Sequence, residues 1–441
     1  MSALLPRSPA PPVDVPPGAS TLLVGANTHL AIHVSHEGAQ DERTIHTIQL
    51  TLEKEGGAEA LIDPAATMRV VAPCAAYTHP SQEPNDHSLS TRSKRMALVD
   101  MSAPHTLSAA QTWTWIYVLV TLWPDQEYFV WRRSSALDVE TVLSCGLAIP
   151  HPDSLQTGSW AEQGDLLVPR AAFWQGAGPF VAGSWVPMLD RIGAVNAYPM
   201  LPMTYKHGAG PNGLLASTQH PLRPLKLGAW RTKETPDVPL YRRYIPALQQ
   251  TLTFRLARAS CKEDVDLLHK WHATERVNTG WRQDMPWEDH KKYLENQEAS
   301  SDSVALIGEW DGEPFGYVEI YHVQESPLRN FFDAGAYDCG FHALVGEEKY
   351  RGPHRVRSWM GSVIHLLFLL DARTMRVVSE PRASNTKMVE YECLCGGHVE
   401  KVCGNDMTDV QLIDLPHKRA ALVWIPRERF FQLCPMGPLN T

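Results

Sequence analysis

Residues 337–370 constrain the fold more than any other part of the chain. They read YDCGFHALVGEEKYRGPHRVRSWMGSVIHLLFLL. The segment 338–346 has the composition of a strand, and the long apolar segment 356–370 predicts a mostly buried helix. A Gly-Pro turn joins the two, and proline is well tolerated in the first turn of a helix. A strand and a buried helix connected so closely indicate a sheet with a helix packed on it.

The predicted strand carries polar side chains where a core strand is normally apolar. Side chains alternate between the two faces of a strand, so Asp338, Gly340 and His342 share one face. A histidine titrates near neutral pH, and with a carboxylate beside it His342 is a candidate general base. The glycine between them leaves room for a ligand backbone.

The turn that follows is basic. The N-terminus of the next helix offers free backbone N–H groups and the positive end of its dipole, and Arg351, Arg355 and Arg357 add charge. This combination predicts a cradle for a small anion such as a pyrophosphate. A capped helix with solvated arginines fits the same spacing, so both interpretations stay open at this point.

Two positions near the next predicted helix carry further chemistry. Arg382 and Asn385 lie between a predicted strand and the helix that follows it, and Tyr391 lies two turns into that helix. A phenol there can donate a proton to a leaving group. The alternative is that Tyr391 is a half-buried packing residue.

A loop upstream, 275–284, has the composition of a substrate clamp. Arg276, Asn278 and Trp281 offer charge-assisted hydrogen bonds and an aromatic wall for a zwitterionic amino acid. An ordinary surface loop is the alternative.

The pattern of the whole chain predicts several domains. At 441 residues the chain is longer than one typical domain. We expect a Pro-rich arm over 1–20, a strand-rich N-terminal domain over 21–200 that includes the run 113–123 as a strand, a connector over 201–245 and a catalytic domain over 246–435. In that last domain helices are expected over 263–276, 287–297, 356–370 and 385–396, with strands between them and a hairpin over 303–323. This alternation is an α+β layout with a mixed sheet.

Charge and apolar runs exclude some partners. The net charge is −9 with no lysine-rich tail, which argues against nucleic acid as a partner. The longest apolar run, 113–123, is about half the length needed to cross a bilayer, so no membrane partner is expected. The N-terminus lacks an apolar signal core and the C-terminus lacks a Ser-Lys-Leu type address. We therefore expect a cytoplasmic protein, with the peroxisome as the alternative and a homodimer as one assembly.

One group of cysteines resembles a metal site by composition only. Cys393, Cys395, His398 and Cys403 are residue types that bind zinc. Zinc sites usually contain two closely spaced pairs of ligands, and this spacing does not. We therefore predict packed thiols instead of zinc.

Several short motifs resemble one known family. They are 271-WHATERVNTGW-281, 315-FGYVEIYHV-323, 342-HALVGEEKYRGPHRVRSW-359, 366-LLFLLDARTMRVVSEPRASNTKM-388 and 414-DLPHKRAAL-422. They are similar to the siderophore-biosynthesis acyltransferases of the Gcn5-related N-acetyltransferase (GNAT) fold. This group includes fungal hydroxyornithine transacylases and a bacterial hydroxylysine acetyltransferase. The resemblance covers 219–431 and is weak before it.

The resemblance implies an acyl-CoA co-substrate, an N-hydroxylated ornithine or lysine as acceptor, a hydroxamate product and no resident cofactor or metal. It implies His342 with Asp338, Ser384 and Tyr391 as the catalytic positions. The implied coenzyme A positions are Val345, Arg351, Gly352, Pro353, His354, Arg355, Val356 and Asn385. The implied acceptor positions are Arg276, Asn278, Trp281, Glu319, Tyr321 and Arg382.

The chain departs from the family at Ser384, where the family has an aspartate. The change leaves three hypotheses: acylation of N5-hydroxyornithine with an acetyl or anhydromevalonyl donor, acetylation of N6-hydroxylysine, or a non-catalytic coenzyme A-binding scaffold. By analogy with two-domain members, the N-terminal half is expected to be a degenerate GNAT-like domain without its own coenzyme A site.

Overall fold

The computed structural model describes residues 18–24, 28–40, 43–52, 61–72, 96–124, 126–151, 164–178, 185, 214–215, 223–224, 239–300, 303–335, 337–371, 373–399, 412–433 and 436. The chain divides into two compact units, Met1–Ser184 and Trp185–Thr441. Each unit is described by itself below. No helix among the described residues is long and apolar enough to cross a membrane.

The C-terminal unit is built on one mixed sheet of eight strands in the order β11-β12-β13-β14-β15-β16-β20-β17. The strands are β11 (Tyr241–Ile245), β12 (Gln250–Leu256), β13 (Ser303–Trp310), β14 (Glu313–His322), β15 (Cys339–Val345), β16 (Arg376–Ser379), β17 (His398–Val399) and β20 (Val423–Pro426). A separate hairpin is formed by β18 (Leu412–Leu415) and β19 (Lys418–Ala421). All pairs of the large sheet are antiparallel except β15 and β16.

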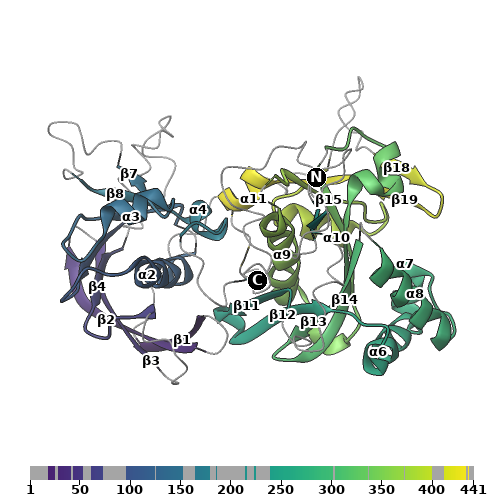
Figure 1. Cartoon of the computed structure of the whole chain (residues 1–441), viewed down its shortest axis with the longest axis horizontal. Helices are drawn as coiled ribbons and strands as arrows, with labels where there is room; N and C mark the ends of the chain where they lie inside the picture. Colours follow the sequence, from purple (N-terminus) through teal and green to yellow (C-terminus); the bar gives the residue numbers. More distant parts are fainter. Residues whose placement is uncertain are drawn as a thin grey trace. The chain divides into compact units, whose positions relative to one another are not determined.

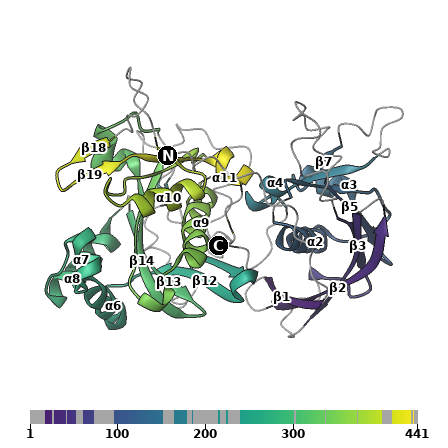
Figure 2. The ribbon, with the colours of Figure 1, turned by 180° about the vertical axis from the view of Figure 1, so that it is seen from behind.

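Helices cover both faces of this sheet (Figures 1 and 2). They are α6 (Lys262–His272), α7 (Glu275–Trp281), α8 (Trp287–Ala299), α9 (Pro353–Leu370), α10 (Thr386–Leu394) and α11 (Arg427–Leu433). In Figure 1, α6, α7 and α8 lie on one side of β14, and α9 and α10 lie on the other. On the first side, Leu268 of α6 and Leu294 of α8 share a core cluster with Ile307 and Tyr317 of the sheet. On the second, Tyr241 of β11 bonds the ring of His365 in α9 at 3.0 Å.

The parallel pair β15–β16 is very short. Only Cys339 with Val377 and Gly340 with Val378 are in register. Beyond these two rows the strands separate, and the crossover between them is α9. This helix starts at Pro353, is preceded by Gly352 at φ 126°, and buries almost all of 356–370. The opening between β15 and β16 is where the sheet leaves space for a ligand.

The N-terminal unit has the same strand order. Its eight strands run β1-β2-β3-β4-β5-β6-β8-β7, and only β5 and β6 are parallel. The strands are β1 (Gly18–Val24), β2 (Thr28–Gln40), β3 (Arg43–Leu52), β4 (Thr67–Val71), β5 (Ala97–Ser102), β6 (Tyr128–Trp131), β7 (Ile149–Pro150) and β8 (Leu166–Pro169). The helices are α2 (Ala109–Leu122), α3 (Val139–Ser144) and α4 (Arg170–Trp174). As in the other unit, one helix crosses between the two parallel strands, and the next-to-last strand in sequence lies at the edge. The prediction of a degenerate GNAT-like domain is therefore confirmed in topology.

Some expected elements are wrong. The Trp-rich run 113–123 lies in α2, although we expected a strand. Its start carries a capping box in which Ser108 and Gln111 bond each other's backbone N–H groups. The run is buried on all sides, so its apolar residues show neither helical nor strand periodicity.

The expected boundaries also shift. Tyr241–Ile245 belongs to β11 and pairs with β12, although we placed it in the connector. The loop expected at 275–284 is largely the short helix α7. Gly18–Ser20 of the expected arm are part of β1. Most of the connector and residues 1–17 lie outside the described residues.

Candidate active site

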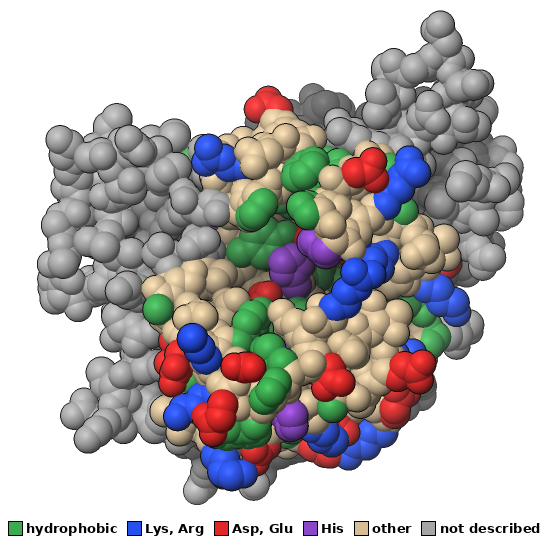
Figure 3. Space-filling model, turned by 90° about the vertical axis from the view of Figure 1, so that its right-hand side faces the viewer, with side chains coloured by type: hydrophobic (Ala, Val, Ile, Leu, Met, Phe, Trp, Pro, Cys, Tyr) green, Lys and Arg blue, Asp and Glu red, His purple; other side chains and the backbone are tan. Residues whose placement is uncertain are grey.

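A cavity of about 380 Å³ opens where β15 and β16 separate. Its wall comes from β15, the end of β16, α7, α8, α10 and the hairpin β18–β19. The lining residues are Gly280, Trp281, Gln283, Tyr293, Glu319, Phe341, His342, Ala343, Ser379, Glu380, Pro381, Arg382, Asn385, Met388, Glu392, His417 and Lys418. A space-filling view of this side shows a hollow where histidine and hydrophobic side chains meet, with basic side chains at its edge (Figure 3).

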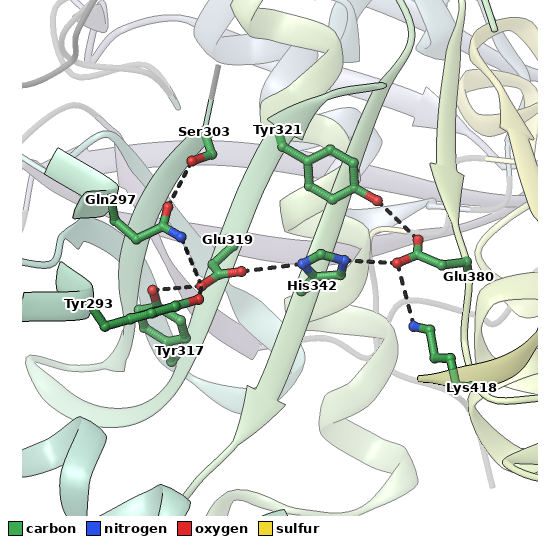
Figure 4. A network of polar contacts seen from close by, with 9 residues as sticks. All are labelled: Tyr293, Gln297, Ser303, Tyr317, Glu319, Tyr321, His342, Glu380 and Lys418. Atoms are coloured by element: carbon green, nitrogen blue, oxygen red, sulfur yellow. Dashed lines mark hydrogen bonds and ion pairs between the residues drawn. The ribbon is translucent and has the colours of Figure 1, made fainter. Parts of the chain in front are cut away.

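His342 is held between two buried carboxylates (Figure 4). Its Nδ1 lies 3.2 Å from Oε2 of Glu319, and its Nε2 lies 2.8 Å from Oε1 of Glu380. Glu319 is opposite His342 in the β14–β15 ladder, and Glu380 directly follows β16. Because a carboxylate only accepts hydrogen bonds, both ring nitrogens donate, and the ring is an imidazolium.

The pKa values of the three groups agree with this geometry. Burial lowers the pKa of His342, but the charge of Glu380 and the hydrogen bonds to both carboxylates outweigh it and raise the pKa to about 10. Burial raises the pKa of Glu380, but the charge of His342 outweighs it and holds the pKa at about 2. The pKa of Glu319 is lowered for the same reason. At neutral pH the three side chains together carry one net negative charge.

Each carboxylate has further donors. Glu380 accepts from the hydroxyl of Tyr321 at 3.0 Å and lies 3.5 Å from Nζ of Lys418 (Figure 4). Glu319 accepts from the hydroxyls of Tyr293 and Tyr317 and, at 3.4 Å, from the amide of Gln297. These bonds fix both carboxylates, and therefore the ring between them.

Aromatic rings complete the walls around His342. The ring of Trp281 meets His342 edge-on at 6.2 Å between centroids, and the ring of Tyr321 lies at 4.8 Å. The side chain of His342 still has 41% of its surface exposed to the empty cavity. A ligand that enters the cavity therefore meets the imidazolium directly.

Asp338 was predicted as the carboxylate beside His342, and this is wrong. Asp338 is buried at the other end of β15, where Oδ2 forms an ion pair with Nη2 of Arg376 at 2.6 Å and accepts from the N–H of Gly335. Two residues predicted to bind the acceptor, Glu319 and Tyr321, take part in the His342 network, and their role towards the acceptor stays a prediction.

Gly340 does not leave a gap for a ligand backbone. A Cβ at Gly340 would lie 2.4 Å from the ring of Tyr321, which fills the space. The glycine is needed so that Tyr321 can cross the strand and reach Glu380.

The basic turn is ordered by internal contacts. Gly352 has a positive φ, and a Cβ there would meet the ring of His354 at 2.8 Å, so glycine is required. Arg351 pairs with Glu348 at 2.7 Å, and Pro353 and His354 are exposed at the start of α9. Arg355 stacks on the rings of Trp310 and Tyr350, at 5.0 and 5.2 Å.

The turn retains hydrogen-bond donors. Nε and Nη1 of Arg355 are buried without a hydrogen-bond partner in the described part of the chain. Val356 is buried in the core of the unit. The predicted coenzyme A role of this turn stays a prediction.

Of the residues predicted in 275–284, only Trp281 lines the cavity. Arg276 instead holds the end of β15: Nη2 donates to the carbonyls of Val345 and Gly346, and Nε pairs with Glu348 at 2.7 Å. The side chain of Asn278 accepts from the backbone N–H of Asp284. Arg276 and Asn278 therefore stabilise the loops of the site and do not line it.

The predicted residues after β16 are partly in the cavity. Arg382 and Asn385 line it, and Asn385 also caps α10 by accepting from the N–H of Met388. Ser384 is exposed, and Tyr391 is half-buried. Neither Ser384 nor Tyr391 is among the described residues that line the cavity.

Among the cavity residues that the sequence reasoning missed are the titratable side chains Glu380, Glu392, His417 and Lys418. Glu380 lies inside the strand predicted over 375–381, and a glutamate in a strand expected to be buried was a usable signal. Glu392 directly follows Tyr391, and a polar residue on a helix gives no sign of burial. Lys418 comes from the hairpin β18–β19, whose position depends on tertiary contacts such as the backbone bond from Ala383 to Arg419.

The cysteine group shows no metal geometry within the described residues. Cys393 and Cys395 are free thiols, and Cys403 lies outside the described residues. No group of three or more histidine, cysteine or acidic side chains in the described ranges is placed to hold a metal ion.

Comparisons with known proteins agree with this architecture. Residues 260–403 match the model of the acetyltransferase (GNAT) domain. The chain is 34% identical over 379 residues to the N(5)-hydroxyornithine:cis-anhydromevalonyl coenzyme A-N(5)-transacylase of Beauveria bassiana, covering 80% of each protein. It is 31% identical over 349 residues to a hydroxyornithine transacylase of Ajellomyces capsulatus, covering 77% of this chain and 75% of that one.

A bacterial relative matches a shorter part of the chain. The N(6)-hydroxylysine O-acetyltransferase of Escherichia coli is 34% identical over 196 residues, covering 44% of this chain and 58% of that protein. The long matches to the fungal proteins decide the assignment. This chain belongs to the GNAT-domain acyltransferase family that contains the fungal hydroxyornithine transacylases.

Proposed function

We propose that this protein transfers an acyl group from acyl-CoA to the side-chain nitrogen of N5-hydroxyornithine and so forms a hydroxamate for a siderophore. The observation that carries the proposal is the cavity between β15 and β16, in which His342 lies between Glu319 and Glu380. The relatives named above supply the substrate class: cis-anhydromevalonyl-CoA is the first donor to test and acetyl-CoA the second.

The charges of the cavity suit an amino acid acceptor. At neutral pH the charges of two carboxylates and two cations cancel: Glu319, Glu380, His342 and Lys418. The positive charge of Arg382 has no counter-charge in this sum. Its one hydrogen bond among the described contacts, to the carbonyl of Gly280, is long at 3.4 Å. We propose that Arg382 binds the α-carboxylate of the acceptor, a pairing that a guanidinium makes well.

The chemistry needs only a weak base. The nitrogen of a hydroxylamine is less basic than that of an alkyl amine, so it is uncharged and nucleophilic at neutral pH. Once it has attacked the thioester carbonyl, it becomes a strong acid. Glu380 can then take the proton although its pKa is low, because the protonated nitrogen of the intermediate is itself a strong acid. Positioning in the cavity supplies much of the acceleration.

A second acceptor, N6-hydroxylysine, is favoured by one observation, the similarity to the bacterial hydroxylysine enzyme over 196 residues. It is longer than the ornithine derivative by one methylene group. The scaffold hypothesis rested on Ser384. In the structure Ser384 is exposed and outside the cavity wall, so its identity does not remove a group from the His342 network.

The test is the release of coenzyme A from cis-anhydromevalonyl-CoA and from acetyl-CoA. The acceptors are N5-hydroxyornithine, N6-hydroxylysine and plain ornithine. We expect release with the hydroxylated acceptors only, and a loss on the order of 10²-fold or more in His342→Ala and Glu380→Gln. Ser384→Asp is expected to stay within about threefold of wild type. Binding of coenzyme A without release for any acceptor would leave the scaffold hypothesis.

Location and assembly are separate proposals. We propose a cytoplasmic enzyme, with peroxisomal import as the alternative, and a homodimer. Fluorescence microscopy of the tagged protein in its own cell tests the first, and light scattering of the purified chain tests the second.

A further inference from the structure

Glu392 is a second acidic group in the wall of the cavity. It lies in α10 and is 2% exposed. The hydroxyl of Ser379 donates to its Oε1 at 2.6 Å, and its Oε2 is buried without a hydrogen-bond partner among the described residues. A buried carboxylate with one unused oxygen is costly unless it holds a proton or meets a ligand.

The groups around Glu392 favour the protonated form. Glu380, which directly follows β16, lies nearby and repels a second negative charge, and Lys418 of β19 partly offsets this repulsion. The phenol of Tyr321 in β14 and the thiols of Cys393 in α10 and Cys395 at its C-terminal end also interact with Glu392, and all three hold their protons because burial raises their pKa values. Burial is the largest effect and brings the pKa of Glu392 to about 8, against the hydrogen bond from Ser379, which lowers it.

Two carboxyl groups of one cavity therefore differ in protonation. Glu380 is ionised at neutral pH and Glu392 carries a proton. Pairs of acidic groups that their surroundings separate in this way divide the roles of base and acid in many enzymes. Acyl transfer from a thioester needs both roles.

We propose that Glu392 is the acid that protonates the sulfur of coenzyme A as it leaves. The proposal rests on the acyl transfer proposed above. The acceptor nitrogen forms a bond to the carbonyl carbon, and the carbon–sulfur bond breaks with its electron pair going to sulfur. The proton of Glu392 passes to that sulfur, and the nitrogen proton passes to Glu380. Before the next turnover Glu380 releases the proton that it accepted to water, and Glu392 takes one proton from water, so the proton count balances. A thiol has a pKa of about 8.5, so the transfer is close to balanced.

The other side chains of the cavity are less suited to this step. The phenols of Tyr293 and Tyr321 donate to Glu319 and Glu380, and burial raises their pKa values. The pKa of His417 is lowered, by burial and by Lys418, so this ring is neutral. Lys418 already interacts with Glu380. Both ring protons of His342 are held by Glu319 and Glu380. Within the described wall, Glu392 is therefore left as the protonated group that has an oxygen without a hydrogen-bond partner.

Tyr391 is the competing candidate, because the sequence alone pointed to it. Tyr391 and Glu392 are consecutive in α10, and consecutive residues on a helix point about 100° apart. Of the two, Glu392 lines the cavity.

The test is the pH dependence of coenzyme A release between pH 6 and 10 for wild type, Glu392→Gln, Tyr391→Phe and Glu390→Gln. The last is a matched control, an exposed glutamate of the same helix. We expect the wild-type kcat to fall above about pH 8, where Glu392 loses its proton. Glu392→Gln should lower kcat on the order of 10²-fold and abolish that fall, with KM for acyl-CoA changed less than about threefold. Tyr391→Phe and Glu390→Gln should keep the fall.

A Glu392→Gln enzyme with wild-type kcat and the same fall above pH 8 would overturn the proposal. So would a Tyr391→Phe enzyme that loses the fall. A wild type that releases no coenzyme A would instead remove the proposed function itself. If Glu392→Gln does not fold, Ser379→Ala tests the proposal in its place. This variant lacks the hydrogen bond that favours the ionised form of Glu392, so the decrease of kcat should move to higher pH. A decrease at the same pH as in wild type contradicts the proposal.

Discussion

At the scale of single residues, the environment of His342 changes what a histidine does. An isolated imidazole loses its proton near pH 6.5 and can act as a base. In this site both nitrogens donate to buried carboxylates, and the ring keeps its second proton. A base that is already protonated accepts no further proton, so the group of this site that accepts a proton is the carboxylate of Glu380.

The first prediction concerns the titration of this ring. NMR of ¹⁵N-labelled histidine should show His342 doubly protonated at pH 8, with a pKa near 10. Glu380→Gln removes the largest interaction that raises this pKa and should lower it more than Glu319→Gln does. A histidine pKa raised by folding stabilises the protein fully below pH 6.5, and this stabilisation disappears as the pH rises through the folded value. A ring that titrates near pH 6.5 in wild type would contradict the geometry.

The second prediction concerns the pH dependence of stability at Glu392. Its pKa is about 4.5 in the unfolded chain and about 8 in the folded one. Between these values the folded state binds more protons, so the free energy of unfolding falls as the pH rises. Glu392→Gln lacks this titration and should therefore gain stability relative to wild type between pH 5 and pH 8, on the order of a few kcal/mol.

Thermal unfolding at the two pH values measures this difference. Glu390→Gln is the control, because its carboxylate is exposed. Equal shifts for the two variants would mean that Glu392 is ionised in the folded protein.

The sequence identified His342 but not its partners. Alternation along one strand points to Asp338, four residues away. The carboxylates that flank the ring are 23 and 38 residues away in sequence. They meet it because β14 and β16 are the neighbours of β15, and strand order is not written in any one segment. The same reason explains why Lys418 was missed.

At the scale of elements, the end of β15 is held by side chains of α6 and α7. Arg276 bonds two carbonyls and Glu348 there, and Lys270 pairs with Glu347 beside it. The side chain of Arg276 is partly buried, while that of Lys270 is 61% exposed. The loop they hold leads into the basic turn before α9.

The third prediction follows from this difference. Arg276→Ala should loosen the loop and weaken the binding of coenzyme A on the order of tenfold, measured by isothermal titration calorimetry, since charge-assisted bonds are lost. Lys270→Ala should change it less than about twofold, because exposed ion pairs contribute little. Equal effects of both variants would mean that the loop does not depend on the bonds from Arg276 to the backbone.

The fourth prediction concerns the crossing of Tyr321 over Gly340. A methyl group at Gly340 would overlap the ring of Tyr321 and displace it from Glu380. Gly340→Ala should destabilise the protein by about 1–3 kcal/mol and reduce kcat. Gly280→Ala is the matched control: nothing lies within 4 Å of a Cβ there, and alanine in a helix should stabilise by about 0.5–1 kcal/mol. Urea unfolding of both variants checks the signs.

Elements whose apolar residues recur with a clear helical or strand period were predictable from the sequence, and elements without such a period were not. The hairpin over 303–323 was expected with Asp311 and Gly312 in its turn, and both have positive φ there. The helix α9 was expected from a long apolar segment. The run 113–123 is equally apolar, but buried on all sides, and only its capping box separates a helix from a strand.

At the scale of the whole molecule, two units have the same strand order, each with one parallel pair and a helix crossing between its strands. The C-terminal unit has the His342 network in the opening beside its parallel pair. In the N-terminal unit the loop between β5 and α2 reads APHTLS and lacks the basic turn. The sequence motifs identified the fold of the C-terminal unit only, because such motifs consist of the residues that form a functional site. A shared topology is fixed by burial patterns that many different sequences satisfy.

The last prediction tests whether the two units are independent in stability. Each has its own buried residues, such as Leu119 in α2 and Phe368 in α9. Calorimetry should therefore resolve two unfolding transitions. Leu119→Ala, expected to cost about 2–5 kcal/mol, should lower only one of them, and Gly340→Ala only the other. Saturating coenzyme A should raise only the transition that Gly340→Ala lowers, because a ligand stabilises the unit that binds it. A single transition moved by both variants would show that the two units unfold together, and a ligand shift of the Leu119 transition would place a coenzyme A site in the N-terminal unit.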